Sequence, residues 1–304
     1  MNRLGVIGKP SDWLIASNVD YQRAKKIFNI DLIDIEIQEL INAYNSKIAS
    51  EHEYFCTFEA KNKFSESEIN KAYKLYLALK DLINKYNLKG ITIRCFDLLK
   101  TICTTSCLAF ALLNKEGIVA TCEGDIPSLL SMYLIKEFCG VSSFQANPSQ
   151  ISVEDNTILM AHCTVPLNMC KSYNFDTHFE SGIGVAINGY LSKEDVYIFK
   201  LSNNLKDFIL LKGKIIKTPF YQNLCRTQVK IKLDDDCSVN YFLTNPLGNH
   251  HIIFYKTDIN RLLNYLNKKE GWPSFLFIVY STVIFFEVIF SKPLKYTLNL
   301  SPKI

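Results

Sequence analysis

The stretch GIVATCEGDIP, residues 117–127, joins an apolar strand-like run to the start of a helix through two carboxylates. A carboxylate that follows a strand of a parallel sheet lies at the sheet edge where α/β folds hold their ligands. Glu123 is therefore predicted to be a site residue. Asp125 has two open interpretations, because an Asp before an early-helix proline is also a common helix cap.

The first half of the chain alternates strand-like runs with segments of helical period. The predicted strands are Leu4–Gly8, Asp31–Ile35, Gly90–Phe96 and Ile118–Thr121. The predicted helices are Ile37–Ile48, Ser65–Tyr86 with a capping-box pattern at its start, Leu98–Leu113 and Pro127–Phe138. A turn and helix cap are expected at residues 9–11. This alternation predicts an α/β domain with a parallel sheet over residues 1–139.

From Ser143 onward the pattern changes to short extended runs separated by Gly, Asn or Asp clusters. These runs are Asn156–Pro166, Ile183–Leu191, Val196–Leu201, Phe208–Ile216, Thr227–Leu233 and His251–Tyr255. They predict a mostly antiparallel β domain, barrel or sandwich, over residues 140–270, with a helix near residues 258–268. The expected fold class is an α/β domain followed by a mostly β domain.

The last segment, residues 271–304, has a different composition. Its apolar run Phe275–Phe290 is interrupted by Glu287, and at 16 residues it is shorter than a membrane-spanning helix requires. A buried strand pair and a membrane anchor are open alternatives. We favour a different hypothesis over the membrane anchor. In it the natural reading frame ends near Glu270 and the tail is aberrant.

Charge and cysteine usage argue against several classes of protein. The chain has 34 basic and 30 acidic residues spread along its length, so no face for nucleic acid is expected. Its ten cysteines are thinly distributed over 304 residues, and no cleavable apolar leader follows Met1. None of them forms a Cys-x-x-Cys pair. We therefore expect a reducing, cytoplasmic location and no structural zinc knuckle.

Four of the five histidines lie in the second half, as His162, His178, His250 and His251. On an extended backbone His178 and Glu180 would share a face and could bind a metal or position a base. The adjacent His250 and His251 would point to opposite faces, so only one could easily reach a shared ion. A Glu with one or two His and further oxygen ligands suits a divalent ion such as Mn²⁺. Such an ion could polarise substrate oxygens while carboxylates beside it move protons.

Seven short motifs occur in an order that resembles the L-fucose isomerase and L-arabinose isomerase superfamily. The central motif is CEGDI at residues 122–126. The supporting motifs are GKPSDWL (8–14), RCF (94–96), AHCT (161–164), HFESG (178–182), CRT (225–227) and GNHH (248–251). The resemblance covers residues 4 to about 256, and the motifs lie between residues 8 and 251 of that region.

The resemblance implies a cytosolic aldose–ketose isomerase that binds Mn²⁺, acts on a monosaccharide and assembles as a homo-oligomer. In the implied enediol mechanism the metal holds O1 and O2 while two acidic residues move protons between C1 and C2. Glu123 matches the first acid, which is both metal ligand and base. One of His250 and His251 matches the family's late histidine ligand, and His162 matches a further histidine ligand of the arabinose branch.

The sequence departs from the family's pattern at the second acid, where it has Asn147. An amide oxygen can bind a metal but cannot accept and return a proton. Either Asp125 or Glu180 replaces the acid, or isomerisation is weak, altered or absent. Family enzymes also carry a further α/β domain ahead of the segment matching residues 4–13, so we expect a fragment of that plan. Three functions stay open: a sugar isomerase, a non-catalytic sugar-binding or regulatory relative and, least favoured, a membrane-tethered protein whose working part is the soluble domains.

Overall fold

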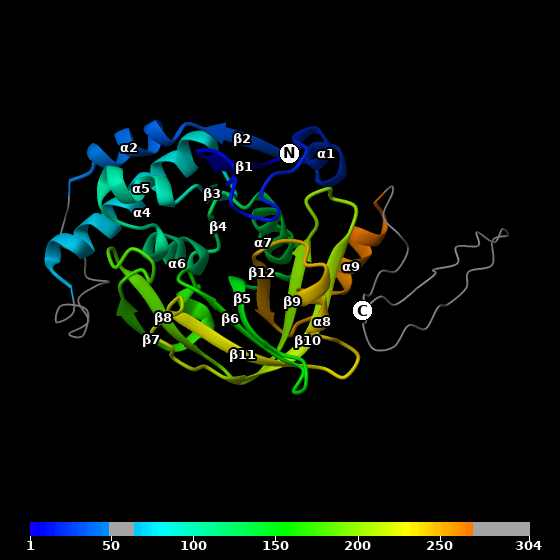
Figure 1. The fold of residues 1–304 in the computed structure, drawn as a ribbon. Helices are drawn as coiled ribbons and strands as arrows, with labels where there is room; N and C mark the ends of the chain where they lie inside the picture. Colours follow the sequence, from blue (N-terminus) through cyan, green and yellow to red (C-terminus); the bar gives the residue numbers. More distant parts are fainter. Residues whose placement is uncertain (49–63, 270–304) are drawn as a thin grey trace, which may run out of the picture.

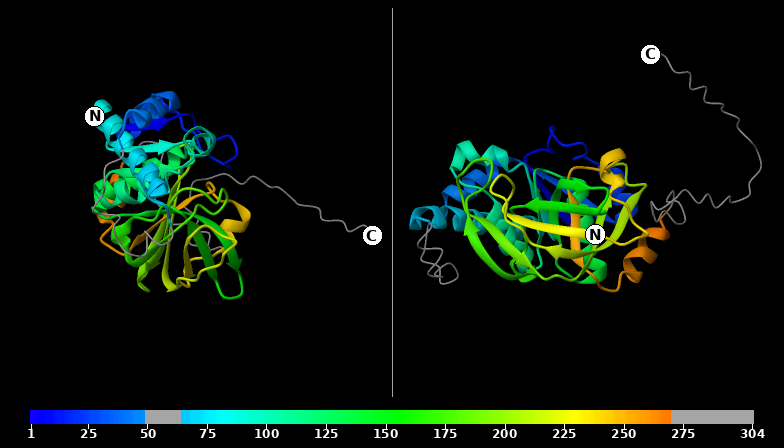
Figure 2. Two further views of the ribbon diagram at one scale, coloured as in Figure 1. Left: turned by 90° about the vertical axis from the view of Figure 1, so that its left-hand side faces the viewer. Right: turned by 60° about the horizontal axis from the view of Figure 1, so that its bottom comes forward.

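A computed structural model describes residues 1–48 and 64–269 (Figure 1). The predictions for the tail after residue 270 lie outside the described residues. A parallel sheet and a closed antiparallel barrel form the frame of the molecule. In Figure 1 and in the left view of Figure 2, most of the blue and cyan elements of the first third of the chain lie above the green and yellow barrel strands.

The parallel sheet has the strand order β2-β1-β3-β4. Its strands are β1 (Asn2–Ile7), β2 (Ile30–Ile35), β3 (Gly90–Ile93) and β4 (Val119–Cys122). All three pairings are parallel, which confirms the prediction from strand and helix alternation. All of β4 is buried, and its last residue brings Glu123 to the carboxyl edge of the sheet.

Six helices are described between these strands and directly after them. They are α1 (Tyr21–Phe28), α2 (Ile37–Asn45), α4 (Glu66–Tyr86), α5 (Phe96–Ile102), α6 (Cys107–Lys115) and α7 (Ile126–Cys139). The predicted capping box is confirmed at α4, where Ser65 Oγ accepts from the Glu68 backbone N–H. The Glu68 carboxylate in turn accepts from the Ser65 backbone N–H at 3.0 Å. The helix therefore begins where the local sequence supplies its missing hydrogen-bond partners.

Two predictions in the first half are wrong. The single helix expected over residues 98–113 is two helices, α5 and α6, bent by 118°. Cys103 ends α5 in the left-handed region at φ 51°, which breaks the helical path. The cap expected at residues 9–11 starts no helix, because α1 begins only after Asp20, whose carboxylate accepts from the Arg23 backbone N–H.

Within residues 1–48 and 64–269, no single helix has the length and apolarity needed to cross a membrane, whereas the bent pair α5 and α6 would pass that test of length and composition together.

The antiparallel barrel closes in the order β10-β11-β6-β5-β12-β9. Its strands are β5 (Phe144–Ser152), β6 (Thr157–His162), β9 (Asp195–Leu201), β10 (Phe208–Lys217), β11 (Thr227–Leu233) and β12 (His251–Tyr255). A barrel is therefore the correct alternative to the sandwich. The remaining elements are the pair β7 (Cys170–Asp176) and β8 (Ala186–Leu191), the 3₁₀ turn Leu167–Met169, α8 (Asn240–Thr244) and α9 (Asn260–Asn267).

Helix α7 lies between the sheet and the barrel. It contacts β3 and β4 on one side and β9, β12 and α9 on the other. Ten of its residues are buried, as expected for a helix that is apolar all round. One apolar cluster includes Leu4 of the sheet, Leu129 of α7 and Phe199 of the barrel. The core is thus continuous across the boundary predicted after residue 139, and the start of α7 is a junction between both parts.

Candidate metal centre

A tight turn after β4 places Glu123. The residue has φ 63°, a left-handed conformation that is uncommon for side chains other than Gly, Asn and Asp. Its backbone carbonyl accepts a hydrogen bond from Ser11 Oγ. Gly124 also has a positive φ, and a Cβ there would lie 2.6 Å from the Lys9 carbonyl oxygen. The glycine is therefore required for the segment around residue 10 to pack against this turn.

Glu123 lies beside two imidazoles from the barrel. Glu123 Oε1 is 3.3 Å from His250 Nε2 and 3.7 Å from His162 Nε2. The three ligand atoms lie within 4.8 Å of one another. Both histidines are buried, whereas the glutamate side chain is 15% exposed. One carboxylate and two imidazoles suit a divalent ion of intermediate hardness.

Asp125 orients His250 from behind. Asp125 Oδ2 lies 2.9 Å from His250 Nδ1, which leaves Nε2 to face Glu123. A histidine that binds a metal commonly donates its other ring N–H to a carboxylate in this way. Asp125 also accepts from the Ser128 backbone N–H at 2.7 Å, so its role as the cap of α7 is confirmed. Its carboxylate is fully buried and does not line the cavity described below.

Lys200 of β9 completes the network at the junction. Its Nζ lies 3.1 Å and 3.0 Å from the two carboxylate oxygens of Asp125, and both side chains have zero exposure. Burying a charge without a partner is costly, so each of these groups depends on the other. The order Lys200, Asp125, His250 and Glu123 alternates positive and negative charge from the interior to the surface of the site.

The pKa values of these side chains follow from the alternation of positive and negative charges along the network. Burial alone would raise the pKa of Asp125, but Lys200 and His250 hold it at about 2. Burial alone would lower the pKa of His250, but Glu123 and Asp125 raise it to about 9. Burial also opposes the charge on Glu123, yet His250 and His162 hold its pKa far below the usual range. Glu123 is therefore an anion at neutral pH, as a metal ligand must be.

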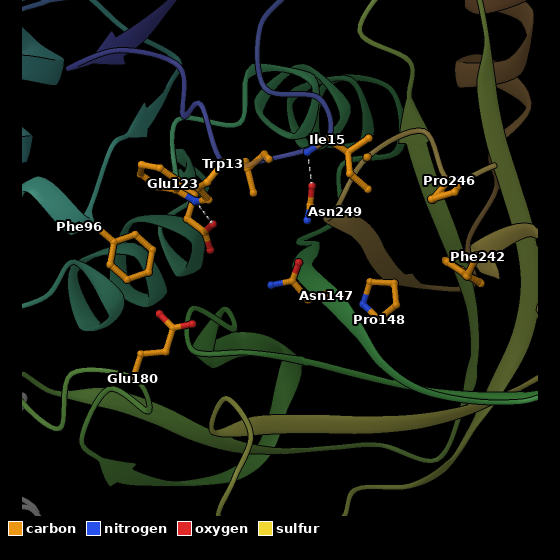
Figure 3. A pocket seen from close by; sticks show the side chains of 12 residues that line it. Trp13, Ile15, Phe96, Glu123, Asn147, Pro148, Glu180, Phe242, Pro246 and Asn249 are labelled. Atoms are coloured by element: carbon orange, nitrogen blue, oxygen red, sulfur yellow. Dashed lines mark hydrogen bonds between the residues drawn. The ribbon is translucent and has the colours of Figure 1, made fainter. Parts of the chain in front are cut away.

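A cavity of about 420 Å³ adjoins Glu123 (Figure 3), within the usual size range for small-molecule sites. Trp13 Nε1 donates to Glu123 Oε2 at 3.0 Å. Asn249 Oδ1 accepts from the Ile15 backbone N–H at 2.6 Å and fixes the segment that carries Trp13. The polar side chains lining the cavity are Trp13, Glu123, Asn147, Glu180 and Asn249, and the apolar ones include Phe96, Pro148, Phe242 and Pro246.

The remaining candidate residues lie at different places relative to Glu123. Asn147 and Glu180 both line the cavity, and Glu180 does not belong to the group of three ligand atoms. His251 is buried on the other side, with Nε2 2.9 Å from the Tyr241 hydroxyl, and burial lowers its pKa to about 3. Of the adjacent pair, His250 is therefore the residue beside Glu123.

The prediction of an extended backbone through His178 and Glu180 is wrong. β7 ends at Asp176, and the residues that follow form a turn in which Ser181 contacts the His178 ring. The two side chains consequently do not lie on one face of a strand.

Three residues of this region were not recognised in the sequence. Trp13 stood in a motif without an assigned role. Lys200 was visible as the one charged residue inside the otherwise apolar run Val196–Leu201, a position that calls for a buried partner. Gln145 gave no signal, although its side-chain amide exchanges hydrogen bonds with the backbone N–H and carbonyl of Cys122 and thereby joins β5 to the end of β4.

The cluster and the cavity define a class of site: a potential metal centre open to a small polar ligand. The chain is 22% identical over 249 residues to sulfoquinovose isomerase of Priestia aryabhattai, which covers 78% of this chain and 55% of that protein. It is 20% identical over 244 residues to the protein of the same name from Alkalicoccus urumqiensis, covering 76% and 54%.

A third relative shows higher identity over a shorter segment. The sulfoquinovose isomerase of Clostridium sp. (strain MSTE9) is 29% identical over 111 residues, which covers 36% of this chain and 24% of that protein. No family model matches the chain. The chain spans about half the length of the curated relatives that it matches over most of its own length.

Proposed function

We propose that this chain provides the metal-binding part of a sugar isomerase that converts an aldose into a ketose. The observation that carries the proposal is the group of Glu123, His162 and His250, whose ligand atoms lie within 4.8 Å of one another. Of the three, Glu123 also lines the cavity. The similarity to proteins named sulfoquinovose isomerase supports the class of reaction.

The donor set fits a divalent ion, and Mn²⁺ is the ion we propose. Glu123, His162 and His250 would hold it. When bound, the ion would polarise two neighbouring oxygens of the sugar and stabilise negative charge that develops on them. The low pKa of Glu123 favours the role of ligand over that of base for this carboxylate. The Trp13 N–H would keep the second carboxylate oxygen in place.

Glu180 is the proposed acid and base for the proton that moves between C1 and C2. It lines the same cavity as Glu123, whereas Asp125 is fully buried and bound to Lys200. Asn147 lines the same cavity and would bind a sugar hydroxyl through its amide. In this proposal Asp125 is a positioning residue that acts through His250.

The substrate is part of the proposal. The relatives' name points to a sulfonated sugar, so the test includes sulfoquinovose beside neutral aldoses. The full chain, loaded with Mn²⁺ in deuterated water, is incubated with each sugar and followed by NMR. Ketose formation or exchange of the C2 proton is expected in the wild type, and a loss of about 100-fold or more in Glu180→Gln. Exposed Glu154 supplies the matched control, Glu154→Gln. Equal exchange in Glu180→Gln would overturn the role of Glu180.

A second candidate is a non-catalytic sugar-binding or regulatory protein. Asn147 favours it, because an amide lines the cavity where the resemblance places the second acid. That function predicts saturable sugar binding without ketose formation or proton exchange. Measurable turnover in the same NMR experiment would remove it. The homo-oligomer and the cytoplasmic location remain predictions in either case.

A further inference from the structure

A second cluster of potential ligands lies outside the proposed sugar site. The ligand atoms of Cys107, Cys163 and His178 all lie within 4.8 Å of one another. Cys225 packs against the same small group, and its thiol is within hydrogen-bond reach of Cys163. Both Cys107 and Cys163 are buried, and none of these side chains lines the cavity beside Glu123.

The four side chains come from segments that are distant in the sequence. Cys107 begins α6, Cys163 directly follows β6, His178 lies in the turn after β7, and Cys225 precedes β11. The missing Cys-x-x-Cys pair excludes a local zinc knuckle but says nothing about a site assembled in this way. The fold thus brings together a donor set that the sequence spacing does not reveal.

We propose that Cys107, Cys163, Cys225 and His178 form a second metal site that takes Zn²⁺. Three thiolates and one imidazole are a common ligand set of structural zinc. With zinc–sulfur bonds of about 2.3 Å, sulfurs at the corners of a tetrahedron lie roughly 3.8 Å apart. The 4.8 Å spread of the first three ligand atoms accommodates such a tetrahedron. The thiol of Cys225 contacts Cys163 but is not one of the three mutually close ligand atoms, so it would move toward the ion to become the fourth ligand.

The environment of His178 supports this role. Its Nδ1 lies 2.9 Å from Ser181 Oγ, so Nδ1–H can donate to that hydroxyl while Nε2 binds the metal. The Ser181 backbone N–H also points to Nδ1 at 3.3 Å, and this weaker contact would be lost on metal binding. Ser181 is therefore a positioning residue for the imidazole.

The two sites differ in the hardness of their donors. Glu123, His162 and His250 offer one carboxylate and two imidazoles, whereas the second cluster offers mainly thiolates, which select zinc and other soft ions. The neighbours His162 and Cys163 belong to different clusters, so the end of β6 and the residue that follows it serve both. The second site is closed, as structural zinc sites are.

A zinc ion here would tie the start of α6 to the turn that carries Glu180. His178 and Glu180 lie two residues apart, and the Phe96 ring contacts His178 with its centroid 6.0 Å away. Glu180 and Phe96 both line the cavity beside Glu123. The second ion would therefore hold the wall of the sugar site in place without touching the sugar.

Cobalt provides a direct test, because a thiolate bound to Co²⁺ gives a charge-transfer absorption that carboxylate and imidazole ligands do not give. The full chain is reduced, freed of metal with a chelator and titrated with Co²⁺. We expect this absorption to saturate at about one equivalent and to disappear when Zn²⁺ is added.

Variants assign the absorption to the cluster. Cys107→Ser and His178→Asn should abolish or shift it, and Ser181→Ala should weaken Zn²⁺ binding by about 10–100-fold. The half-buried Cys139 is outside the cluster, so Cys139→Ser is the matched control and should leave the absorption unchanged. Glu123→Gln should also leave it unchanged, which separates this proposal from the sugar site. A folded wild-type chain without thiolate absorption would overturn the proposal, as would an unchanged absorption in both Cys107→Ser and His178→Asn.

Discussion

The two clusters bring their potential metal ligands together in different ways. The cluster around Glu123 is part of a chain of alternating charges that starts at the fully buried Lys200 and ends at a partly exposed carboxylate that lines the cavity. The cluster around Cys163 consists of two buried thiols and one partly buried imidazole. Charged groups behind the ligands orient the first cluster, whereas the packing of distant segments assembles the second.

Removing the buried positive charge of Lys200 should have the largest effect on stability. Lys200→Met leaves Asp125 buried without its lysine partner, and we expect a loss of about 3–5 kcal/mol in the free energy of unfolding, measured with urea. The control is Lys256→Met, because Lys256 pairs with Asp195 at an exposed position and should contribute about 0–1 kcal/mol. Equal losses in the two variants would show that the charge chain does not support the site.

Removing the negative charge behind His250 should affect one cluster only. Asp125→Asn takes away the anionic acceptor 2.9 Å from His250 Nδ1, and we expect Mn²⁺ affinity to fall by about 10–100-fold. Calorimetric titration measures this change. Zn²⁺ binding by the thiolate cluster should not change. A parallel loss of both ions would mean that the two clusters are one coupled unit.

The pH dependence of Mn²⁺ binding follows from the pKa of His250. In the metal-free protein this pKa is raised from 6.5 to about 9, so below pH 9 the metal must displace a proton. Affinity should rise by about tenfold per pH unit up to about pH 9 and then level off. By the same linkage, the stability that protonated His250 gives the metal-free fold is complete below pH 6.5 and lost as pH rises through 9. An affinity that is constant from pH 7 to 9 would contradict the assigned ligand.

The hydrogen bond from Trp13 should make the smallest contribution. Trp13→Phe removes the donor to Glu123 Oε2 but keeps an aromatic ring beside Phe96 and Arg94. We expect Mn²⁺ affinity to fall by about threefold to tenfold, as for one partly exposed hydrogen bond. Calorimetry at fixed pH detects this change. An unchanged affinity would show that the tryptophan only shapes the cavity.

The sequence predicted the open site far better than the closed one. Glu123 was found because a carboxylate after a buried strand at a sheet edge is a local pattern, and the capping box of α4 is local as well. By contrast, β5 was missed because its sequence FQANPSQIS contains a proline, which is unusual inside a strand. In the structure its pairing with β6 shifts register between Pro148 and Gln150. Strand pairing decides its structure, and pairing is not a local property.

Tertiary contacts also decide the remaining differences. The choice between His250 and His251 depends on which side of the barrel wall faces β4, and the thiol cluster depends on four distant segments. A lone charge in an apolar run indicates that Lys200 has a buried partner. The sequence does not identify that partner, because Asp125 is 75 residues away. Local patterns thus identify donors, and the fold determines which donors meet.

The most direct test of the metal centre at Glu123 is a Mn²⁺ titration of the wild-type chain and of Glu123→Gln at pH 8, with exposed Glu154→Gln as the control. We expect saturable binding of about one Mn²⁺ in the wild type and in Glu154→Gln, and none at millimolar concentrations in Glu123→Gln. Equal binding in all three chains, or no binding in the wild type, would contradict it.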